Sequence, residues 1–266
     1  MENISQEVYN RINNEVYKTH GDSWWRPDQI LHLLKTSVNP WRVGYATRIL
    51  RQLHIDPHGR TALEVGSGGG ILTEEIARMG FTTTGIEPAT ESLEAARKHA
   101  GEVGLAITYD QGTGEQLPYA DESFDSVFCC DVLEHVRDLP KVISEISRVL
   151  KPNGIFIYDT INRTFISNLV AIKIWQDWKW WAFMPPNLHV WKMFIKPEEM
   201  KSLLSRNGLE WQDHIGSEPN VPLPTMLKYL RRRARGEWTY TELGKNFWLK
   251  ESRDMNILYG GYALKK

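Results

Sequence analysis

The sequence predicts an α/β fold built on a doubly wound sheet of seven strands, with helices on both faces. Through the middle of the chain, short β-like segments alternate with helical segments of about 10 to 15 residues, as expected for parallel strands joined by crossover helices. A glycine-rich turn at 66–70 links one such strand to the next helix. The composition, 41% hydrophobic and 24% charged in a chain of 266 residues, indicates one sizeable core.

The elements follow one another from residue 61 to residue 160. Strands are expected at 61–65, 82–86, 105–109, 124–130 and 155–160, and helices at 71–79, 90–103 and 139–150 lie between them. The sequence Lys-Pro-Asn-Gly at 151–154 ends the last of these helices, because proline lacks an N–H donor and glycine favours a turn. The α/β core therefore fills about 61–160.

Further elements flank this core. Helical segments around 4–18, 27–35 and 40–53 are expected to cover the top of the sheet, and a tryptophan-rich stretch, 163–193, follows the core. A helix at 197–206, a strand at 209–215, a basic segment at 228–236 and a strand near 255–263 complete the chain. Because there is no repeat and no flexible linker, one domain, 1–266, is expected. Its parts are an N-terminal helical cap (1–60), the core (61–160), a Trp-rich cap insertion (163–196) and C-terminal strands and helix (197–266).

Composition excludes several classes of protein. The formal charge of −1 gives no reason to expect a nucleic-acid partner, since phosphate binding needs a basic excess. The two cysteines, Cys129 and Cys130, are neighbours and cannot form a disulfide framework. The start of the chain lacks the basic and apolar segments of a secretory signal, and no apolar run is long enough to span a bilayer. We therefore expect a cytoplasmic protein.

The glycine-rich turn predicts a nucleotide-type ligand. It runs from Gly66 to Gly70 between a strand and a helix, where backbone N–H groups can approach a bound ligand. Counted from Gly66, the third glycine of a dinucleotide fingerprint falls on Ile71, which weakens that interpretation. Glu87 ends the next strand, about 20 residues on, where a carboxylate can accept both hydroxyls of a ribose. The alternative is a solvated acid at a strand end.

Five short motifs, together with two elements outside the core, carry a family resemblance. They are Leu-Glu-Val-Gly-Ser-Gly-Gly-Gly (63–70), Gly-Ile-Glu-Pro (85–88), Gly-Thr-Gly-Glu-Gln-Leu-Pro (112–118), Ser-Phe-Asp-Ser-Val (123–127), Leu-Glu-His-Val (133–136), Asn-Pro-Trp-Arg-Val-Gly-Tyr (39–45) and Phe-Ile-Lys-Pro (194–197). With them the chain resembles the class I S-adenosylmethionine-dependent methyltransferases, and more closely the ubiquinone-biosynthesis O-methyltransferase family, over roughly 24–215. The resemblance implies a Rossmann-like methyltransferase sheet.

The same resemblance implies a binding site for S-adenosylmethionine. The residues expected to line it are Arg42, Glu64, Gly66, Ser67, Gly68, Glu87, Pro88, Thr113, Gly114, Glu115 and Cys130. Arg42 can pair with the methionine carboxylate in a two-pronged contact, while Glu64 helps to hold the glycine loop and the amino-acid end of the cofactor. Thr113 to Glu115 follow the third strand, where the adenine sits. For Cys130, plain packing is the alternative.

Two features are candidates for assisting the reaction. A sulfonium is already an activated methyl donor, but a phenol acceptor gains from a base or a metal at neutral pH. His189 aligns with a histidine of the family and is the candidate base, together with His135, although Val190 replaces the family's neighbouring aspartate.

Asp131, Glu134 and His135 would share one face if they began a helix, and could then hold Mg²⁺. The family carries Glu-x-x-Glu-His here, so Asp131 departs from its pattern. In methyltransferases without a metal, the same acid and histidine only fix the loop.

The expected substrate is a hydrophobic aromatic small molecule, a phenol or quinol. In the family, an insertion at this place covers the active site and touches lipid, and here 165–184 is rich in tryptophan. An aromatic lid, a peripheral membrane contact and ordinary packing are the three interpretations. Rival functions are N- or C-methylation of an indole or amine, and a non-catalytic adaptor that keeps the cofactor fold. The sequence does not define the oligomeric state.

Overall fold

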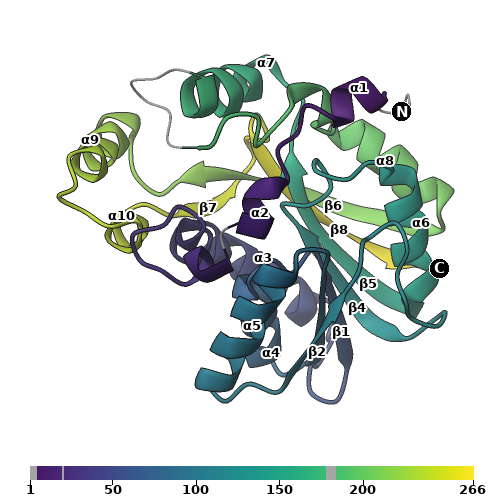
Figure 1. The fold of residues 1–266 in the computed structure, drawn as a ribbon. Coiled ribbons are helices and arrows are strands. Elements are labelled where there is room, and N and C mark those ends of the chain that lie inside the picture. Colours follow the sequence, from purple (N-terminus) through teal and green to yellow (C-terminus); the bar gives the residue numbers. More distant parts are fainter. Residues whose placement is uncertain (1–4, 20, 178–183) are drawn as a thin grey trace.

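A mixed sheet of eight strands forms the centre of this computed structural model, which describes residues 5–19, 21–177 and 184–266 (Figure 1). The strands are β1 (Thr61–Val65), β2 (Thr82–Glu87), β3 (Ile107–Gln111), β4 (Phe124–Cys130), β5 (Leu150–Ile161), β6 (Leu209–Pro219), β7 (Leu249–Ser252) and β8 (Leu258–Lys265). Their order in the sheet is β3-β2-β1-β4-β5-β8-β6-β7.

The direction of winding reverses between β1 and β4. Strands β1 to β5 pair in parallel, and β8, β6 and β7 extend the sheet in antiparallel pairs. The chain proceeds from β1 outward through β2 to β3, then returns to β4 beside β1 and continues to β5. In such sheets the crevice at the reversal, outside the carboxyl ends of the strands, is where ligands bind.

Helices cover both faces of the sheet (Figure 1). One face packs against α3 (Asn39–Gln52), α4 (Ile71–Arg78) and α5 (Thr90–Glu102), through apolar residues such as Ile49, Ile76 and Leu93. The other face packs against α6 (Leu139–Val149) and α8 (Pro197–Arg206), through Val142, Ile146 and Leu204. Each of these helices repeats apolar residues at spacings of three and four, which places them on one side.

The remaining elements are helices and helical turns. They are α1 (Gln6–Tyr9), α2 (Glu15–Thr19), η1 (Gly21–Trp24), η2 (Leu34–Val38), α7 (Phe165–Ser167), η3 (Asn168–Asp177), η4 (Trp191–Met193), α9 (Leu223–Ala234) and α10 (Tyr240–Asn246). Of residues 27–35, all expected to be helical, 27–31 form turns, and the chain becomes helical only from residue 32, where it leads into the π-helical turn η2.

The sequence predicted seven strands, and the structure has an eighth, β7, at the edge of the sheet. Its sequence, Leu-Lys-Glu-Ser, lacks the alternation of apolar residues that marks a strand, and only pairing with β6 makes it one. The third strand begins at Ile107 rather than Leu105, because the amide of Leu105 still bonds to Ala100 at the end of α5. Residues 151–154 belong to β5, with a register shift opposite Phe124.

The tryptophan-rich insertion is described only in part. Trp178, Trp180 and Trp181 lie outside the described residues, so the aromatic cap stays a prediction. The described part presents apolar side chains to solvent, since Phe165 is 80% exposed and Ile166 and Leu169 are exposed too. None of the helices in the described residues is long and apolar enough to cross a bilayer.

Candidate active site

The glycine loop between β1 and α4 lies at the carboxyl end of β1, at the reversal of the sheet. Gly66, Gly68 and Gly70 all have positive φ, which L-residues with a side chain rarely adopt. The amides of Gly66 and Ser67 both donate to the carbonyl of Ile86 in β2, at 2.8 and 3.0 Å. A Cβ added at Gly66 would lie 2.3 Å from Val132. Backbone conformation and crowding therefore both require glycine here.

Glu87 ties the end of β2 to this loop. Its carboxylate accepts hydrogen bonds from the amide of Gly68 at 3.1 Å and from the amide of Ala89 at 3.0 Å. Burial raises the pKa of Glu87, while these two amide donors lower it. Each carboxylate oxygen keeps a second lone pair, so the group predicted to accept ribose hydroxyls can do so while it positions the loop.

Glu64 lies buried beneath the loop, and the side chain of Ser67, a loop residue, is buried against Gly85 of β2. Glu64 accepts a hydrogen bond from Thr73 in α4, which fixes β1 against the helix that follows the loop. Burial raises the pKa of Glu64 to about 8, although Thr73 and Arg42 lower it, so the carboxyl carries a proton at neutral pH. The Ser67 hydroxyl is buried without a hydrogen-bond partner among the described residues.

Arg42, in α3, is held by two carboxylates. Its Nε and Nη2 donate to Asp159 in β5 at 2.6 and 3.0 Å, and Nη2 also lies 2.5 Å from Asp131 at the end of β4. Burial raises the pKa of Asp131, but the Arg42 charge outweighs it and the net shift is downward. The predicted pairing of Arg42 with a ligand carboxylate stays a prediction. The structure gives this guanidinium a role in holding Asp131 and Asp159.

Sequence reasoning missed Asp159. The available signal was an isolated acid inside the apolar strand at 155–161, where an unpaired carboxylate would be costly to bury. Cys130 is a neighbour of Asp159, and burial raises the pKa of its thiol. Together with Trp41, Tyr45 and Met79 it lines a small internal cavity. Such buried, largely apolar surroundings are equally typical of a cysteine that only packs in the core, which was the alternative interpretation of Cys130.

The loop after β3 contains Thr113, Gly114 and Glu115. Gly114 packs against Val65, which a Cβ on the glycine would approach to 3.0 Å. Glu115 accepts a hydrogen bond from the amide of Arg137 at 3.1 Å. Thr113 is exposed, as is Pro88 beside Glu87. The loop therefore lies against β1 next to the glycine loop, with two of the predicted contact residues open to solvent.

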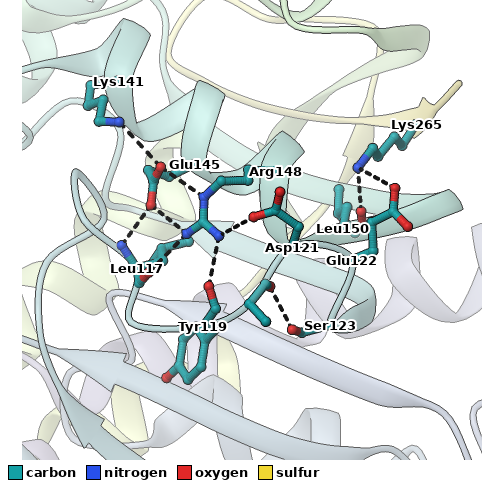
Figure 2. A network of polar contacts seen from close by, with 11 residues as sticks. Leu117, Tyr119, Asp121, Glu122, Ser123, Lys141, Glu145, Arg148, Leu150 and Lys265 are labelled. Carbon is teal, nitrogen blue, oxygen red and sulfur yellow. Dashed lines mark hydrogen bonds and ion pairs between the residues drawn. The ribbon is translucent and has the colours of Figure 1, made fainter.

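An arginine on α6 anchors the far end of this loop (Figure 2). Arg148 donates to the carbonyls of Leu117 and Tyr119 at 2.9 and 2.7 Å, and to Asp121 at 2.8 Å. It also pairs with Glu145, whose carboxylate accepts from the amide of Leu117 at 3.0 Å. One guanidinium thus fixes the segment 117–121, two residues beyond Glu115.

The two candidate bases lie side by side. The ring centroids of His135 and His189 are 5.2 Å apart, although the residues come from the turn after β4 and from the insertion. Burial lowers the pKa of His135 to about 3 and that of His189 to about 4, so both rings are neutral at pH 7. Nδ1 of His189 is buried and has no hydrogen-bond partner within the described part of the chain. A ligand with a hydroxyl could bond to it.

The three predicted metal ligands do not converge. Residues 131–135 form a turn rather than the start of a helix, with Asp131 at a φ of +54°. Asp131 pairs with Arg42, Glu134 accepts from Thr160 at 2.9 Å, and His135 contacts Asn14 at 3.2 Å.

Burial and the charge of Asp131 raise the pKa of Glu134 to about 8. Over residues 5–19, 21–177 and 184–266, no three histidine, cysteine or acidic residues are placed to share a metal ion. Mg²⁺ remains a prediction.

Comparison with known proteins gives consistent results. Residues 63–158 match the family described as "Methyltransferase domain". The ubiquinone biosynthesis O-methyltransferase of Azorhizobium caulinodans is 35% identical over 203 residues, which cover 74% of this chain and 79% of that protein. The protein of the same name from Actinobacillus pleuropneumoniae serotype 5b is 36% identical over 224 residues, covering 81% and 89%.

Solved structures share the fold at low sequence identity. Magnesium protoporphyrin IX methyltransferase from Synechocystis, with bound SAH, has a TM-score of 0.62 and 16% identity, covering 98% of this chain and all (100%) of that one. A SAM-dependent methyltransferase from Aquifex aeolicus has a TM-score of 0.56 and 14% identity, covering 90% and 95%. These likenesses confirm the Rossmann-like fold.

Proposed function

Because the chain belongs to the class I S-adenosylmethionine-dependent methyltransferases, with relatives named ubiquinone biosynthesis O-methyltransferase, we propose that it O-methylates a hydrophobic phenol or quinol-like small molecule. The identity of 35–36% to those relatives, over 79–89% of their length, carries this proposal. An enzyme of this family uses S-adenosylmethionine as its methyl donor. The adaptor alternative is therefore set aside.

In this proposal the donor lies across the glycine loop. Its ribose hydroxyls would bond to Glu87, which the loop amides already orient, and its adenine would lie against the segment Thr113–Glu115. Arg42, Asp131 and Asp159 would surround the methionine end, where a site richer in carboxylates than in guanidinium suits a sulfonium and an ammonium group.

We propose that the acceptor lies between the donor and the histidine pair. An acceptor oxygen attacks the methyl carbon, the C–S bond breaks, and S-adenosylhomocysteine leaves with the electron pair of that bond. The phenolic proton passes to Nδ1 of His189, which has no partner in the described residues and accepts the proton in the tautomer that carries its hydrogen on Nε2. His135, 5.2 Å away between ring centroids, limits where that ring can lie. The enzyme's main contribution is alignment and exclusion of water.

We propose that the insertion covers the acceptor. Gln176 in η3 accepts from the amide of His189 at 2.6 Å and donates to its carbonyl at 3.1 Å, so the insertion itself positions the base. The exposed side chains of Phe165 and Leu169 suit an apolar substrate or a lipid surface. N-methylation of an indole or amine is the second candidate, since such acceptors would use the same aromatic surroundings without Mg²⁺.

The test is formation of S-adenosylhomocysteine by the purified protein with catechols that carry alkyl tails, compared with indoles and alkyl amines, each with and without EDTA. We expect turnover of the catechols only, improving as the tail lengthens. Turnover of amines or indoles with none of catechols would overturn O-methylation in favour of the second candidate. Loss of catechol turnover in EDTA, restored by Mg²⁺, would support the metal prediction.

The base is tested with His189→Gln, with His58→Gln, an exposed histidine, as the matched control. Loss of a general base costs roughly 10²- to 10⁴-fold in kcat. The loss should shrink as the pH approaches the pKa of the phenol, because the phenolate needs no base. Binding of S-adenosylmethionine should not change. An equal loss at every pH would contradict the proton-acceptor role.

A further inference from the structure

The N-terminal strap, defined here as residues 13–17 and 21–25, runs between the insertion and the glycine loop. Figure 1 shows α1 and α2, the purple segments, running from the edge of the molecule to its centre. The amide of Asn13 donates to the carbonyl of Asn187 in the insertion at 2.8 Å. At the other end, the indole of Trp25 donates to the carbonyl of Gly69 at 2.8 Å. The strap therefore joins the substrate side of the site to the glycine loop.

Trp24 occupies the space that the glycine loop leaves open. A Cβ added at Gly68 would lie 2.5 Å from its ring, and one added at Gly69 would lie 2.2 Å from it. The indole is 6% exposed. Two of the glycines that were expected to admit a ligand are thus also required for the close approach of this side chain, which covers the outer side of the loop.

Tyr17 fills the next position along the same crevice. Its ring stacks on Trp24 with centroids 6.0 Å apart and meets His135 edge-on at 5.9 Å. Burial raises the pKa of the phenol, and the charges of Asp131, Glu134 and Glu87 raise it further. Tyr17 therefore lies near carboxyl groups that follow both β4 and β2, on the two sides of the proposed donor site.

One serine holds both aromatic residues. Ser92, in α5, is completely buried and accepts a hydrogen bond from the indole N–H of Trp24 at 2.9 Å. The same hydroxyl donates to the carbonyl of Tyr17 at 2.9 Å. Ser92 belongs to the helix after β2 and is none of the residues assigned to the donor or the acceptor.

We propose that Tyr17 and Trp24 form the outer wall of the donor site and that Ser92 is the positioning residue that sets them there. This inference rests on the proposed placement of the donor across the glycine loop. Because Trp24 lies directly against Gly68 and Gly69, a donor beside Glu87 would meet the two rings at its side and would not lie between Trp24 and the loop. Entry of the donor and release of S-adenosylhomocysteine require the strap to lift.

The experiment compares Ser92→Ala with Ser147→Ala. Ser147 is a matched control, because its hydroxyl also bonds to a backbone carbonyl, that of Asn207 at 2.6 Å, but between α6 and the end of α8. For each protein, the Kd of S-adenosylhomocysteine, the KM of the donor and kcat are measured. Hydrogen exchange of the strap amides is followed with and without the ligand.

Ser92→Ala should weaken S-adenosylhomocysteine binding and raise the donor KM about tenfold, the effect of losing hydrogen bonds of ordinary strength that hold the strap closed. Its kcat at saturating donor should stay within about twofold, or rise if product release limits turnover. In the wild type, the ligand should slow exchange in the strap, and Ser92→Ala should reduce that protection. Ser147→Ala should leave Kd and protection unchanged.

Two results would overturn the inference alone: a wild type that binds the ligand while Ser92→Ala binds it equally well, or equal losses in Ser92→Ala and Ser147→Ala. A wild type that fails to bind S-adenosylhomocysteine would overturn the placement of the donor, and the inference with it. As a second variant, Tyr17→Leu should also weaken the binding of S-adenosylhomocysteine, since it removes the aromatic ring and leaves Ser92 in place.

Discussion

Among individual residues, the buried carboxyl groups divide into two kinds. Asp131 lies against Arg42, which lowers its pKa and keeps it charged. Glu64 and Glu134 have neither a lysine nor an arginine within ion-pair distance in the described structure, and burial raises the pKa of each to about 8. The first kind supplies negative charge where we propose that the cationic donor binds. The second supplies neutral hydrogen-bonding groups that fix the loop and the turn after β4.

Replacement of Glu87 should weaken the binding of the donor. Glu87→Gln places an amide NH₂ against the amide of either Gly68 or Ala89, so one donor loses its acceptor and the glycine loop loosens. Hydrogen bonds to charged groups contribute about 1.5–3 kcal/mol, so donor affinity should fall roughly 10- to 100-fold. Calorimetric titration with S-adenosylhomocysteine measures this. Glu94→Gln, an exposed acid on α5, is the control and should bind normally.

Among the structural elements, the loop after β3 depends on a helix that never reaches the site. Arg148 in α6 bonds to two loop carbonyls and to Asp121, while Glu145 holds the amide of Leu117 (Figure 2). Every one of these bonds is made by a side chain of α6, a helix that carries none of the residues assigned to the donor site. Helix α6 therefore helps to fix the position of Thr113–Glu115 through the neighbouring segment 117–121.

Arg148→Met should therefore affect both stability and donor binding. It removes charge-assisted bonds to the loop and leaves Glu145 without its main partner, which we expect to lower the free energy of unfolding by about 2 kcal/mol. The donor KM should rise more than kcat falls, because only the loop position changes. Chemical denaturation and steady-state kinetics check the two effects. Arg51→Met, an exposed arginine on α3, should change neither; an equal effect there would contradict this role.

For the whole molecule, buried titrating groups set the pH dependence of stability. Burial lowers the pKa of His135 to about 3 and those of His189 and His214 to about 4, against 6.5 when unfolded. Between pH 6.5 and 4 the unfolded chain binds more protons, so stability falls as the pH falls. Glu64 and Glu134 act in the opposite sense. Their pKa values rise from 4.5 to about 8, so stability falls as the pH rises over that range.

The free energy of unfolding should therefore be greatest near pH 6 and fall on both sides. Urea denaturation from pH 4 to pH 9 measures the curve. His214→Gln, which keeps an acceptor for the hydroxyl of Tyr158, should flatten the acid side alone, and Glu134→Gln should flatten the alkaline side alone. A curve that rises steadily to pH 9 would show that the two glutamates ionise freely in the folded protein.

How far the sequence could predict the site depends on the range of the interactions involved. The glycine turn, Glu87 and the strand and helix pattern were predictable because each depends on residues close together in the chain. Asp159, Asn14 and Thr160 were not, because each became part of the site only by meeting a partner 26 to 121 residues away. The expected cluster of Asp131, Glu134 and His135 assumed a helix that the positive φ of Asp131 excludes.

The sequence by itself determined the core of this protein, since periodic apolar residues and turn-forming glycines and prolines select strands, helices and their alternation locally. Only the tertiary structure decided three further features. It added β7, a polar segment that becomes a strand through its partner β6. It placed His189 of the insertion beside His135 of the turn after β4. It also laid Tyr17 and Trp24 over the glycine loop. Each of these contacts joins segments that no local pattern relates, and they form because burial and pairing are satisfied only after the chain has folded.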